Sequence, residues 1–281
     1  MDLKLACADF TFPLLSFEKT LDLLVMLELP AVDIGLFEGV QHLTPSGELR
    51  NVERSAAKLK NALEMRGLRL ADMFVVAALD RESLAPNNPD PGELRKSREI
   101  LDRALEYTKL AGGSHLTQLP GVPFASESAE DSFKRASDEL AWRVERANEY
   151  GVVYSVEAHL ESIIETPEQV IRMVESTPNL TLSLDYTHFT KAGYSDAEIE
   201  SLLQYASHFH VRGARKERLQ APFSENTIDY GRVLNVMNDQ NYSGYQALEY
   251  VWIEWEHCNE SDNLSETILF RDFLKNFAKE I

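Results

Sequence analysis

The segment LTLSLDYTHFTKAG, residues 180–193, shows the unit from which the fold is built. Residues 180–184 have strand character, with leucines separated by threonine and serine. The strand runs into Asp185 and, three residues later, His188. It therefore delivers a carboxylate and an imidazole into the loop that follows, and the segment is best explained as a strand whose carboxyl end carries chemistry.

The same unit recurs along the chain. Eight short, β-rich segments alternate with eight helical segments, without a Ser/Gly linker or a low-complexity stretch. Parallel strands need crossovers, and eight strand–helix units fit a closed barrel of about 250 residues better than an open sheet. No GxGxxG or GxxxxGK[ST] motif supports an open, doubly wound sheet. We predict an α/β fold, a single (β/α)8 TIM barrel domain over residues 1–281. The predicted strands are residues 3–10, 31–37, 69–76, 114–119, 152–159, 180–186, 208–213 and 245–251.

The helix boundaries carry recognisable signals. Thr166, Pro167 and Gln169 are predicted to be an N-cap, a first-turn proline and a capping-box glutamine. Gly113 and Gly151 stand where two long helices, over residues 91–113 and 129–151, are expected to end. The Pro/Asn-rich segment 79–94 before the first of these helices is interpreted as a lid or an ordinary loop.

Composition and charge narrow the function. The chain has 44% apolar and 26% charged residues and no run of about 20 apolar residues, so no membrane partner is expected. Its start does not resemble a signal peptide, which makes a cytoplasmic location the default expectation. The net charge of −18 argues against nucleic acid as a partner and is interpreted as a solvated surface rather than an acidic docking face. Cys7 and Cys258 are expected to be free thiols.

The ends of the last four predicted strands carry the candidate functional residues. In a barrel of this kind the active site lies at the carboxyl ends of the strands. Glu157, Asp185, His210 and Glu249 are separated by 28, 25 and 39 residues, each close to one strand–helix repeat. We therefore expect four neighbouring strands to direct one potential ligand each toward a common point. Further polar residues at these ends are His159, His188 and Arg212.

Three carboxylates brought together in an apolar setting would repel one another unless a cation neutralised them. With one imidazole they form an oxygen-rich site that suits Mn²⁺, Mg²⁺ or Co²⁺, with Zn²⁺ as a further option. His208 would face the same side as His210 and is a competing ligand. A lone Asp or His at a strand end is more often a structural hydrogen-bond partner, but four at matching repeats favour a metal site. His42, His115 and His257 lack such partners and are expected to be surface or loop residues.

The chain resembles the xylose isomerase-like barrels, also called sugar phosphate isomerases/epimerases. The segments that carry the resemblance are VEAHLESIIETPEQVIRMVES, NLTLSLDYTHF, HFHVRGA and TIDYGRVLNVMNDQNYSGYQALEY. They resemble a strand-five glutamate, an Asp-x-x-His, a His-x-His and a Gly-Tyr stretch before a strand-eight glutamate. The resemblance to ketose 3-epimerases of the D-tagatose/D-psicose type implies one divalent metal on Glu157, Asp185, His210 and Glu249, with His188 touching substrate.

The sequence departs from these epimerases at two positions. Their second glutamate corresponds to Ile163 here, with Glu161 as an approximate substitute, and their substrate arginine corresponds to Lys216, between Arg215 and Arg218. Inosose dehydratases and isomerases, dehydroshikimate dehydratase, hydroxypyruvate isomerase and enzymes of 3-keto-glycosides resemble the chain to the same degree. The resemblance also implies a possible homo-oligomer.

The function predicted from these residues is metal-dependent isomerisation or epimerisation of a small keto sugar or cyclitol, by proton transfer next to a carbonyl through an enediolate. Glu157 and Glu249 are the predicted acid/base pair. The residues predicted to contact substrate are His188, His159, Arg212 or Arg215, and Trp252. A dehydratase or lyase using the same site is the main alternative. A noncatalytic sugar-binding barrel and a DNA-repair enzyme related to endonuclease IV are weaker ones.

Overall fold

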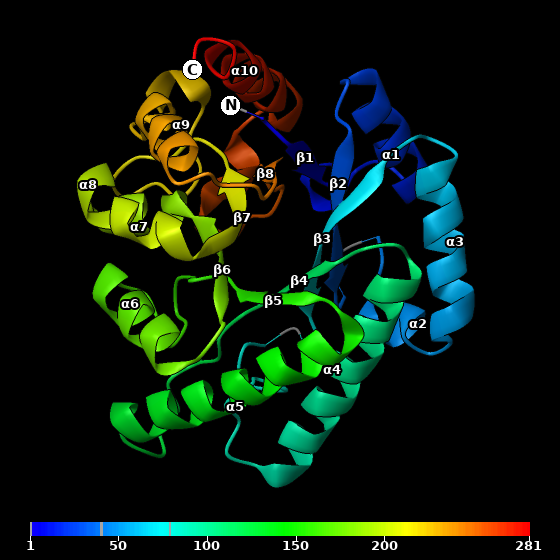
Figure 1. Cartoon of the computed structure of the whole chain (residues 1–281), viewed down its shortest axis with the longest axis vertical. Helices are drawn as coiled ribbons and strands as arrows, with labels where there is room; N and C mark the ends of the chain where they lie inside the picture. Colours follow the sequence, from blue (N-terminus) through cyan, green and yellow to red (C-terminus); the bar gives the residue numbers. More distant parts are fainter. Residues whose placement is uncertain (1, 40–41, 79) are drawn as a thin grey trace.

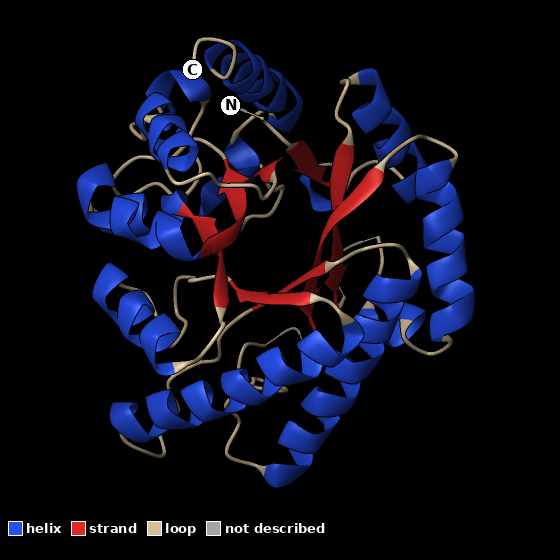
Figure 2. Ribbon diagram, in the orientation of Figure 1, coloured by secondary structure: helices blue, strands red, loops and turns tan. Residues whose placement is uncertain are grey.

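The computed structural model describes residues 2–39, 42–78 and 80–281. Within this part of the chain, the strands form a closed parallel barrel in the order β1 to β8. Figure 1 shows the barrel viewed down its middle, and Figure 2 shows the helices arranged outside the strands. Leu5 of β1 pairs with Gln246 of β8, which closes the sheet. The predicted (β/α)8 TIM barrel is confirmed.

The strands agree closely with the prediction, and β2 and β3 have the predicted bounds. The strands are β1 Leu5–Ala8, β2 Ala31–Phe37, β3 Arg69–Val76, β4 His115–Gln118, β5 Val153–Val156, β6 Thr181–Asp185, β7 Ala206–Val211 and β8 Gln246–Leu248. Where bounds differ, the sequence prediction mostly ran past the strand into the polar loop at its carboxyl end. The site residues therefore lie at, or just beyond, the last hydrogen-bonded residues of the sheet.

The crossovers contain long helices and short ones. The helices are α1 Phe17–Met26, α2 Pro45–Glu48, α3 Val52–Glu64, α4 Pro91–Leu110, α5 Ala129–Tyr150, α6 Pro167–Ser176, α7 Tyr186–Ala192, α8 Asp196–Ile199, α9 Tyr230–Asp239 and α10 Asn263–Phe277. Short 3-10 turns are η1 Asp9–Thr11, η2 Glu200–Tyr205, η3 Phe223–Glu225 and η4 Trp255–Glu260. Among the described residues, no helix combines the length and apolar character needed to cross a bilayer.

Local chemistry explains where the longer helices begin and end. The capping box predicted before α6 is present, with Thr166 and Gln169 satisfying each other's backbone donors. Asp90 caps α4 by accepting from two backbone amides, directly before Pro91. Gly151 ends α5 with a left-handed φ of 66°, a conformation that glycine adopts without a steric penalty.

The main apolar core lies between the barrel and the helices that surround it. Inside the barrel the packing is divided. A cluster of Ala6, Ala31, Ala71 and Ala247 fills one part with small side chains. Across from it, the hydroxyls of Thr117, Ser155 and Ser183 bond to one another over 2.6–2.9 Å. The barrel interior is therefore partly polar, and these three hydroxyls serve as hydrogen-bond partners for one another.

The α4–α5 side of the molecule contains a buried arginine. Arg143 is fully buried and donates from three nitrogens, to Glu139 at 3.0 Å, Gln118 at 2.7 Å and Ser97 at 2.8 Å. These partners come from α5, β4 and α4. Because each guanidinium nitrogen has a partner and Glu139 supplies the opposite charge, Arg143 joins two helices to the barrel without leaving its charge unpaired.

Candidate active site

Four buried side chains converge at the carboxyl ends of β5 to β8. Glu157 follows β5, Asp185 ends β6, His210 lies in β7 and Glu249 follows β8. Their exposed fractions are between 0 and 4%, and one oxygen or nitrogen atom from each lies within 4.8 Å of the others. The four positions chosen from their spacing in the sequence are therefore brought together by the barrel.

His210 occupies the centre of this cluster. Its Nδ1 lies 2.8 Å from Glu157 Oε1 and 3.4 Å from Glu249 Oε2. Arg212, two residues further along the chain, places Nη2 2.7 Å from Asp185 Oδ2 and 3.8 Å from Glu249 Oε2. The imidazole and the guanidinium thus lie between the three carboxylates.

A threonine that follows Asp185 fixes the orientation of this carboxylate. The backbone N–H of Thr187 donates to Asp185 Oδ1 at 2.8 Å, and its hydroxyl donates to Oδ2 at 2.8 Å. The same hydroxyl accepts from Arg212 Nε at 3.1 Å. Thr187 was not predicted from the sequence, although its position at the start of α7, two residues after a strand-end aspartate, is the pattern of a helix cap.

In this cluster three buried carboxylates share two nearby cationic groups, His210 and Arg212, and three pKa values in the cluster are shifted. Burial raises the pKa of Glu249 to about 8, and Glu157 and Asp185 add to this rise against the opposing effects of His210 and Arg212. Burial alone would lower the pKa of His210, but Glu249 and Glu157 raise it well above its usual value. Burial would raise the pKa of Asp185, and Arg212 and His210 nevertheless lower it.

The cluster has the donor set of a divalent cation site. Glu249 Oε2 and His210 Nε2 are buried and have no hydrogen-bond partner in the part of the chain that the structure describes. Buried polar atoms without partners are costly, and carboxylate oxygens with one imidazole suit Mn²⁺, Mg²⁺ or Co²⁺. The residues present therefore fit a divalent metal ion, whose identity the geometry leaves open.

His188 lies beside the cluster as a neutral hydrogen-bond donor. Its Nδ1 accepts from the backbone N–H of Leu160 at 3.2 Å, so the proton of the neutral ring is on Nε2. Burial and then Arg212 lower the pKa of His188 well below its usual value. Nε2 lies 3.5 Å from Asp185 Oδ2 and makes no hydrogen bond within the described chain. The ring of His159 lies 4.3 Å from that of His188.

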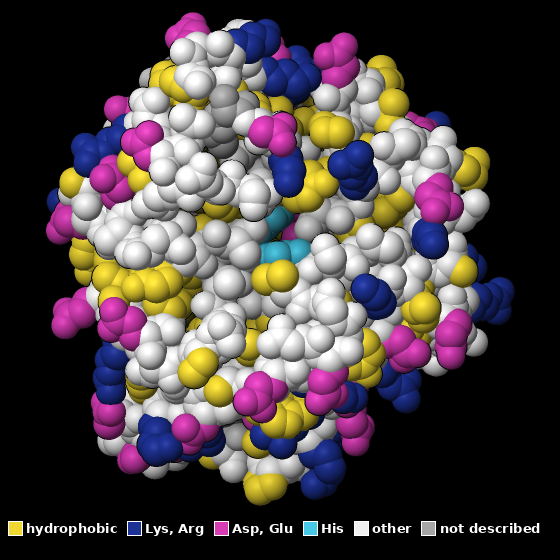
Figure 3. Space-filling view, in the orientation of Figure 1, with side chains coloured by type: hydrophobic (Ala, Val, Ile, Leu, Met, Phe, Trp, Pro, Cys, Tyr) yellow, Lys and Arg dark blue, Asp and Glu magenta, His cyan; other side chains and the backbone are white. Residues whose placement is uncertain are grey.

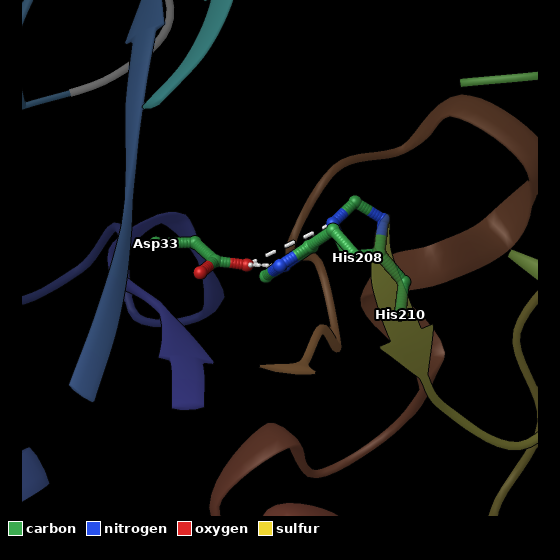
Figure 4. Close-up of side chains that lie close together, drawn as sticks. All are labelled: Asp33, His208 and His210. Carbon is green, nitrogen blue, oxygen red and sulfur yellow. Dashed lines mark hydrogen bonds and ion pairs between the residues drawn. The ribbon is translucent and has the colours of Figure 1, made fainter. Parts of the chain in front are cut away.

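His208, the competing ligand, takes another partner. Asp33 of β2 lies across the barrel from β7, and its Oδ2 is 2.7 Å from His208 Nε2 and 3.8 Å from His210 Nε2 (Figure 4). His208 therefore pairs with Asp33, and these two residues form with His210 a second group that could hold a metal ion. Of the two histidines, His210 is the one that belongs to the four-residue cluster. Asp33 was missed in the sequence because one aspartate within an apolar strand gave no spacing signal.

The expectation for His115 was wrong. This histidine is buried in β4, where Nδ1 lies 2.6 Å from Asp72 Oδ1 and Nε2 lies 2.7 Å from Ser207 Oγ. With His208 it lines a pocket of about 870 Å³. Figure 3 shows a hollow with histidine side chains at its base in the centre of the face in view.

The other two histidines of this group lie in loops or turns. His42 is in a loop, as expected, but its ring contacts the buried Asp9 at 3.1 Å. His257 has a side chain that is 70% exposed, as expected for a surface residue.

Residues 30–273 match the model of the xylose isomerase-like TIM barrel family. The chain belongs to this family. Among curated members, it is 22% identical to inosose dehydratase of Clostridium perfringens, over 70% of this chain and 74% of the relative. It is 23% identical to the putative hydroxypyruvate isomerase of Mus musculus, over 70% of this chain and 75% of the relative.

Solved structures show the same barrel. D-psicose 3-epimerase from Clostridium cellulolyticum H10, solved with D-tagatose, superposes with a TM-score of 0.76 at 14% identity, covering 98% of this chain and 99% of the other. At this identity the likeness establishes the shared fold. The sequence-based assignment to the xylose isomerase-like family is confirmed.

Two residues predicted to contact substrate lie away from the cluster. Arg215 has a side chain that is 43% exposed, and its Nε pairs with Glu225 at 3.1 Å. Trp252 is 39% exposed and lines a separate pocket of about 190 Å³ next to residues 11–15. Trp255, rather than Trp252, stacks on His159, with ring centroids 5.3 Å apart and an angle of 15° between the ring planes.

The two departures from the ketose 3-epimerase pattern are also visible in the structure. Ile163 is buried with an exposed fraction of 7%, and Glu161 turns outward to pair with Arg81 at 2.9 Å. Lys216 is exposed. The second glutamate and the arginine that the resemblance implied therefore have no counterpart at these positions, and neither position belongs to the four-residue cluster.

Cys7 and Cys258 are free thiols, as predicted. Both are buried, and Cys258 lies in η4 beyond β8. Burial raises the pKa of each thiol. Neither side chain is therefore a reactive thiolate near neutral pH.

Proposed function

We propose that this chain is a divalent-metal-dependent isomerase or epimerase of a small keto sugar or cyclitol. The observation that carries the proposal is the buried cluster of three carboxylates and one imidazole, with unpartnered atoms on Glu249 and His210. The family includes enzymes named as sugar epimerases, isomerases and dehydratases, so the same barrel accompanies related chemistry.

The residues proposed to hold the metal are Glu157, Asp185, His210 and Glu249. When bound there, a divalent ion would polarise the carbonyl of the substrate and make the neighbouring C–H more acidic. Thr187 and Arg212 keep Asp185 in a fixed orientation for this task.

Glu157 and Glu249 are the proposed acid/base pair. They follow β5 and β8, and one carboxylate oxygen of each lies near His210 Nδ1, at 2.8 Å for Glu157 and 3.4 Å for Glu249. One carboxylate removes a proton from the carbon next to the carbonyl, and the other returns a proton to the opposite face, which inverts that carbon. Return of the proton to the neighbouring carbon instead gives isomerisation.

His188 is the proposed substrate-orienting residue. Its ring is neutral, its Nδ1 is occupied by the Leu160 amide, and its Nε2–H is free to donate to a substrate oxygen. Arg212 adds a fixed positive charge beside Asp185, where negative charge develops on the substrate. Arg212 is preferred over Arg215 because Arg215 pairs with Glu225 outside the cluster.

A dehydratase acting on a keto cyclitol is the second candidate, and the similarity to inosose dehydratase favours it. One carboxylate of the pair removes the proton next to the carbonyl, and the other, in its protonated form, donates a proton to the β-hydroxyl, which leaves as water. An absorbing enone product distinguishes this outcome from epimerisation.

The test of the proposal begins with metal content, measured by mass spectrometry on wild-type protein, Asp185→Asn and the surface control Asp239→Asn. We expect about one Mn²⁺, Mg²⁺ or Co²⁺ per chain in the wild type and the control, and loss of the metal in Asp185→Asn. Keto sugars and inososes are then screened for deuterium uptake from D₂O, which Glu249→Gln should abolish. No metal in any protein after reconstitution, or full turnover by Glu249→Gln, would contradict the proposal.

A further inference from the structure

We propose that an apolar pocket beside the candidate active site binds an apolar substituent of the substrate. This inference rests on the proposed function and specifies its substrate class: a keto sugar or cyclitol that carries an alkyl or aryl group. The pocket has a volume of about 450 Å³, within the range of about 300–1,000 Å³ typical of sites for small molecules. It lies at the carboxyl ends of β3 and β4, outside the four-residue cluster.

A continuous set of ring contacts joins this pocket to the candidate site. His188, whose Nε2 lies 3.5 Å from Asp185, contacts the ring of His159 at 4.3 Å. His159 stacks on Trp255 at 5.3 Å, and the guanidinium of Arg81 lies 5.2 Å from the centre of the Trp255 ring. His159, Trp255 and Arg81 all line the pocket. His159 therefore borders both His188 and the pocket, so that a substituent of a substrate held at His188 would reach the pocket past the ring of His159.

The loop that carries Arg81 is fastened over this region. Arg81 donates to the backbone carbonyl of Leu160 and pairs with Glu161 at 2.9 Å. These contacts join the β3–α4 loop to the loop after β5, and Trp255 comes from the segment after β8. The loops after β3, β5 and β8 thus contact one another and together form one wall of the pocket.

The lining of the pocket is mainly apolar. Its apolar side chains include Val76, Leu84, Ala85, Leu119, Val122 and Ile253. Three of the polar side chains next to them have hydrogen-bond partners within the protein. Asp80 accepts from the backbone amides of its own loop, Gln118 accepts from Arg143 and Tyr154, and Ser162 donates to the carbonyl of Ile164.

These contacts decide which chemistry fits. A sugar ring placed against the aliphatic wall would exchange hydrogen bonds to water for apolar contacts, and each unmatched hydroxyl is costly. An alkyl or aryl group would lose no hydrogen bonds and would pack against Trp255 and the aliphatic wall. The pocket therefore favours an apolar substituent over a second hydroxylated unit.

The test compares two unreactive probes that differ only in this substituent, 4-nitrophenyl β-D-glucopyranoside and methyl β-D-glucopyranoside. Binding to metal-reconstituted protein is measured by calorimetry. We expect the aryl probe to bind at least about tenfold more tightly than the methyl probe. Ile253→Asn and Trp255→Ala should remove this advantage, whereas Trp252→Ala, which changes a tryptophan at a different pocket, should retain it. Thermal melting of each variant identifies loss of fold.

Each outcome has a distinct meaning. Equal affinity for the two probes, no binding of either, or an aryl advantage that persists in both folded pocket variants would overturn the apolar subsite. A protein that holds about one metal per chain but shows no aryl advantage contradicts the subsite alone. A protein without metal contradicts the proposed function, whether or not the aryl probe is preferred.

Discussion

Replacing Thr187 by valine removes one hydroxyl from the base of the candidate site with little change in volume. That hydroxyl donates to Asp185 Oδ2 at 2.8 Å and accepts from Arg212 Nε at 3.1 Å, and the side chain is fully buried. A hydrogen bond to a charged group contributes about 1.5–3 kcal/mol, so two such bonds give a loss of at least about 3 kcal/mol in the free energy of unfolding. At about 2–4 °C per kcal/mol, the melting temperature should fall by about 6 °C or more.

The assay is thermal unfolding of metal-free protein, followed by Mn²⁺ titration by calorimetry. Thr187→Val should also weaken metal binding by about 10–100-fold, because Asp185 loses a partner that orients it. Thr187→Ser is the matched control, since it keeps the hydroxyl and loses only a methyl group, at about 1 kcal/mol. Thr187→Val melting within about 1 °C of Thr187→Ser, with equal Mn²⁺ affinity, would refute the argument that this hydroxyl orders the carboxylate and the guanidinium.

Three further predictions concern the fold around the site. Arg143→Leu removes a cation that pairs with the buried Glu139. We expect the free energy of unfolding, measured with urea, to fall by about 3–5 kcal/mol while Mn²⁺ binding is retained. A variant as stable as the wild type would contradict the stabilising role of this pair. Gly121→Ala places a Cβ 2.3 Å from Asn87 Oδ1 at a residue whose φ is +108°. We expect the free energy of unfolding to fall by about 1–3 kcal/mol. An unchanged midpoint of urea unfolding would exclude this strain. Cys7 and Cys258 should not react with a thiol reagent in native protein within minutes but should both react in urea, and rapid native labelling would show that the buried thiols are accessible.

The sequence predicted those parts of the molecule that repeat. Strand–helix alternation predicted the barrel, and the spacing from Glu157 to Glu249 predicted that four residues would meet, because successive parallel strands end at one edge. Contacts between distant, unrepeated positions left no such signal. Asp33 meets His208 across 175 positions, and Asp72 meets His115 across 43. Both are single polar residues within apolar strands, so only the closed barrel reveals their partners.

Loop residues were the least predictable part of the site. Trp252 and Trp255 are three residues apart, and the sequence could not tell which one faces inward. Trp255 stacks on His159, whereas Trp252 lines another pocket. Directly after Trp255 the backbone has positive φ at Glu256 and His257, a conformation that no regular periodicity describes. Arg215 likewise follows β7 closely but turns outward to Glu225.

The four residues proposed to hold the metal come from the second half of the chain, between residues 157 and 249, whereas most of the neighbouring apolar wall comes from residues 75–122. The residues of the pocket can therefore be changed without changing the four residues of the cluster. Exchange of the segment between β3 and α5 with that of another family member would alter what the barrel admits while leaving the four side chains in their own strands. A library confined to that segment would test whether substrate range can be changed without touching the four-residue cluster.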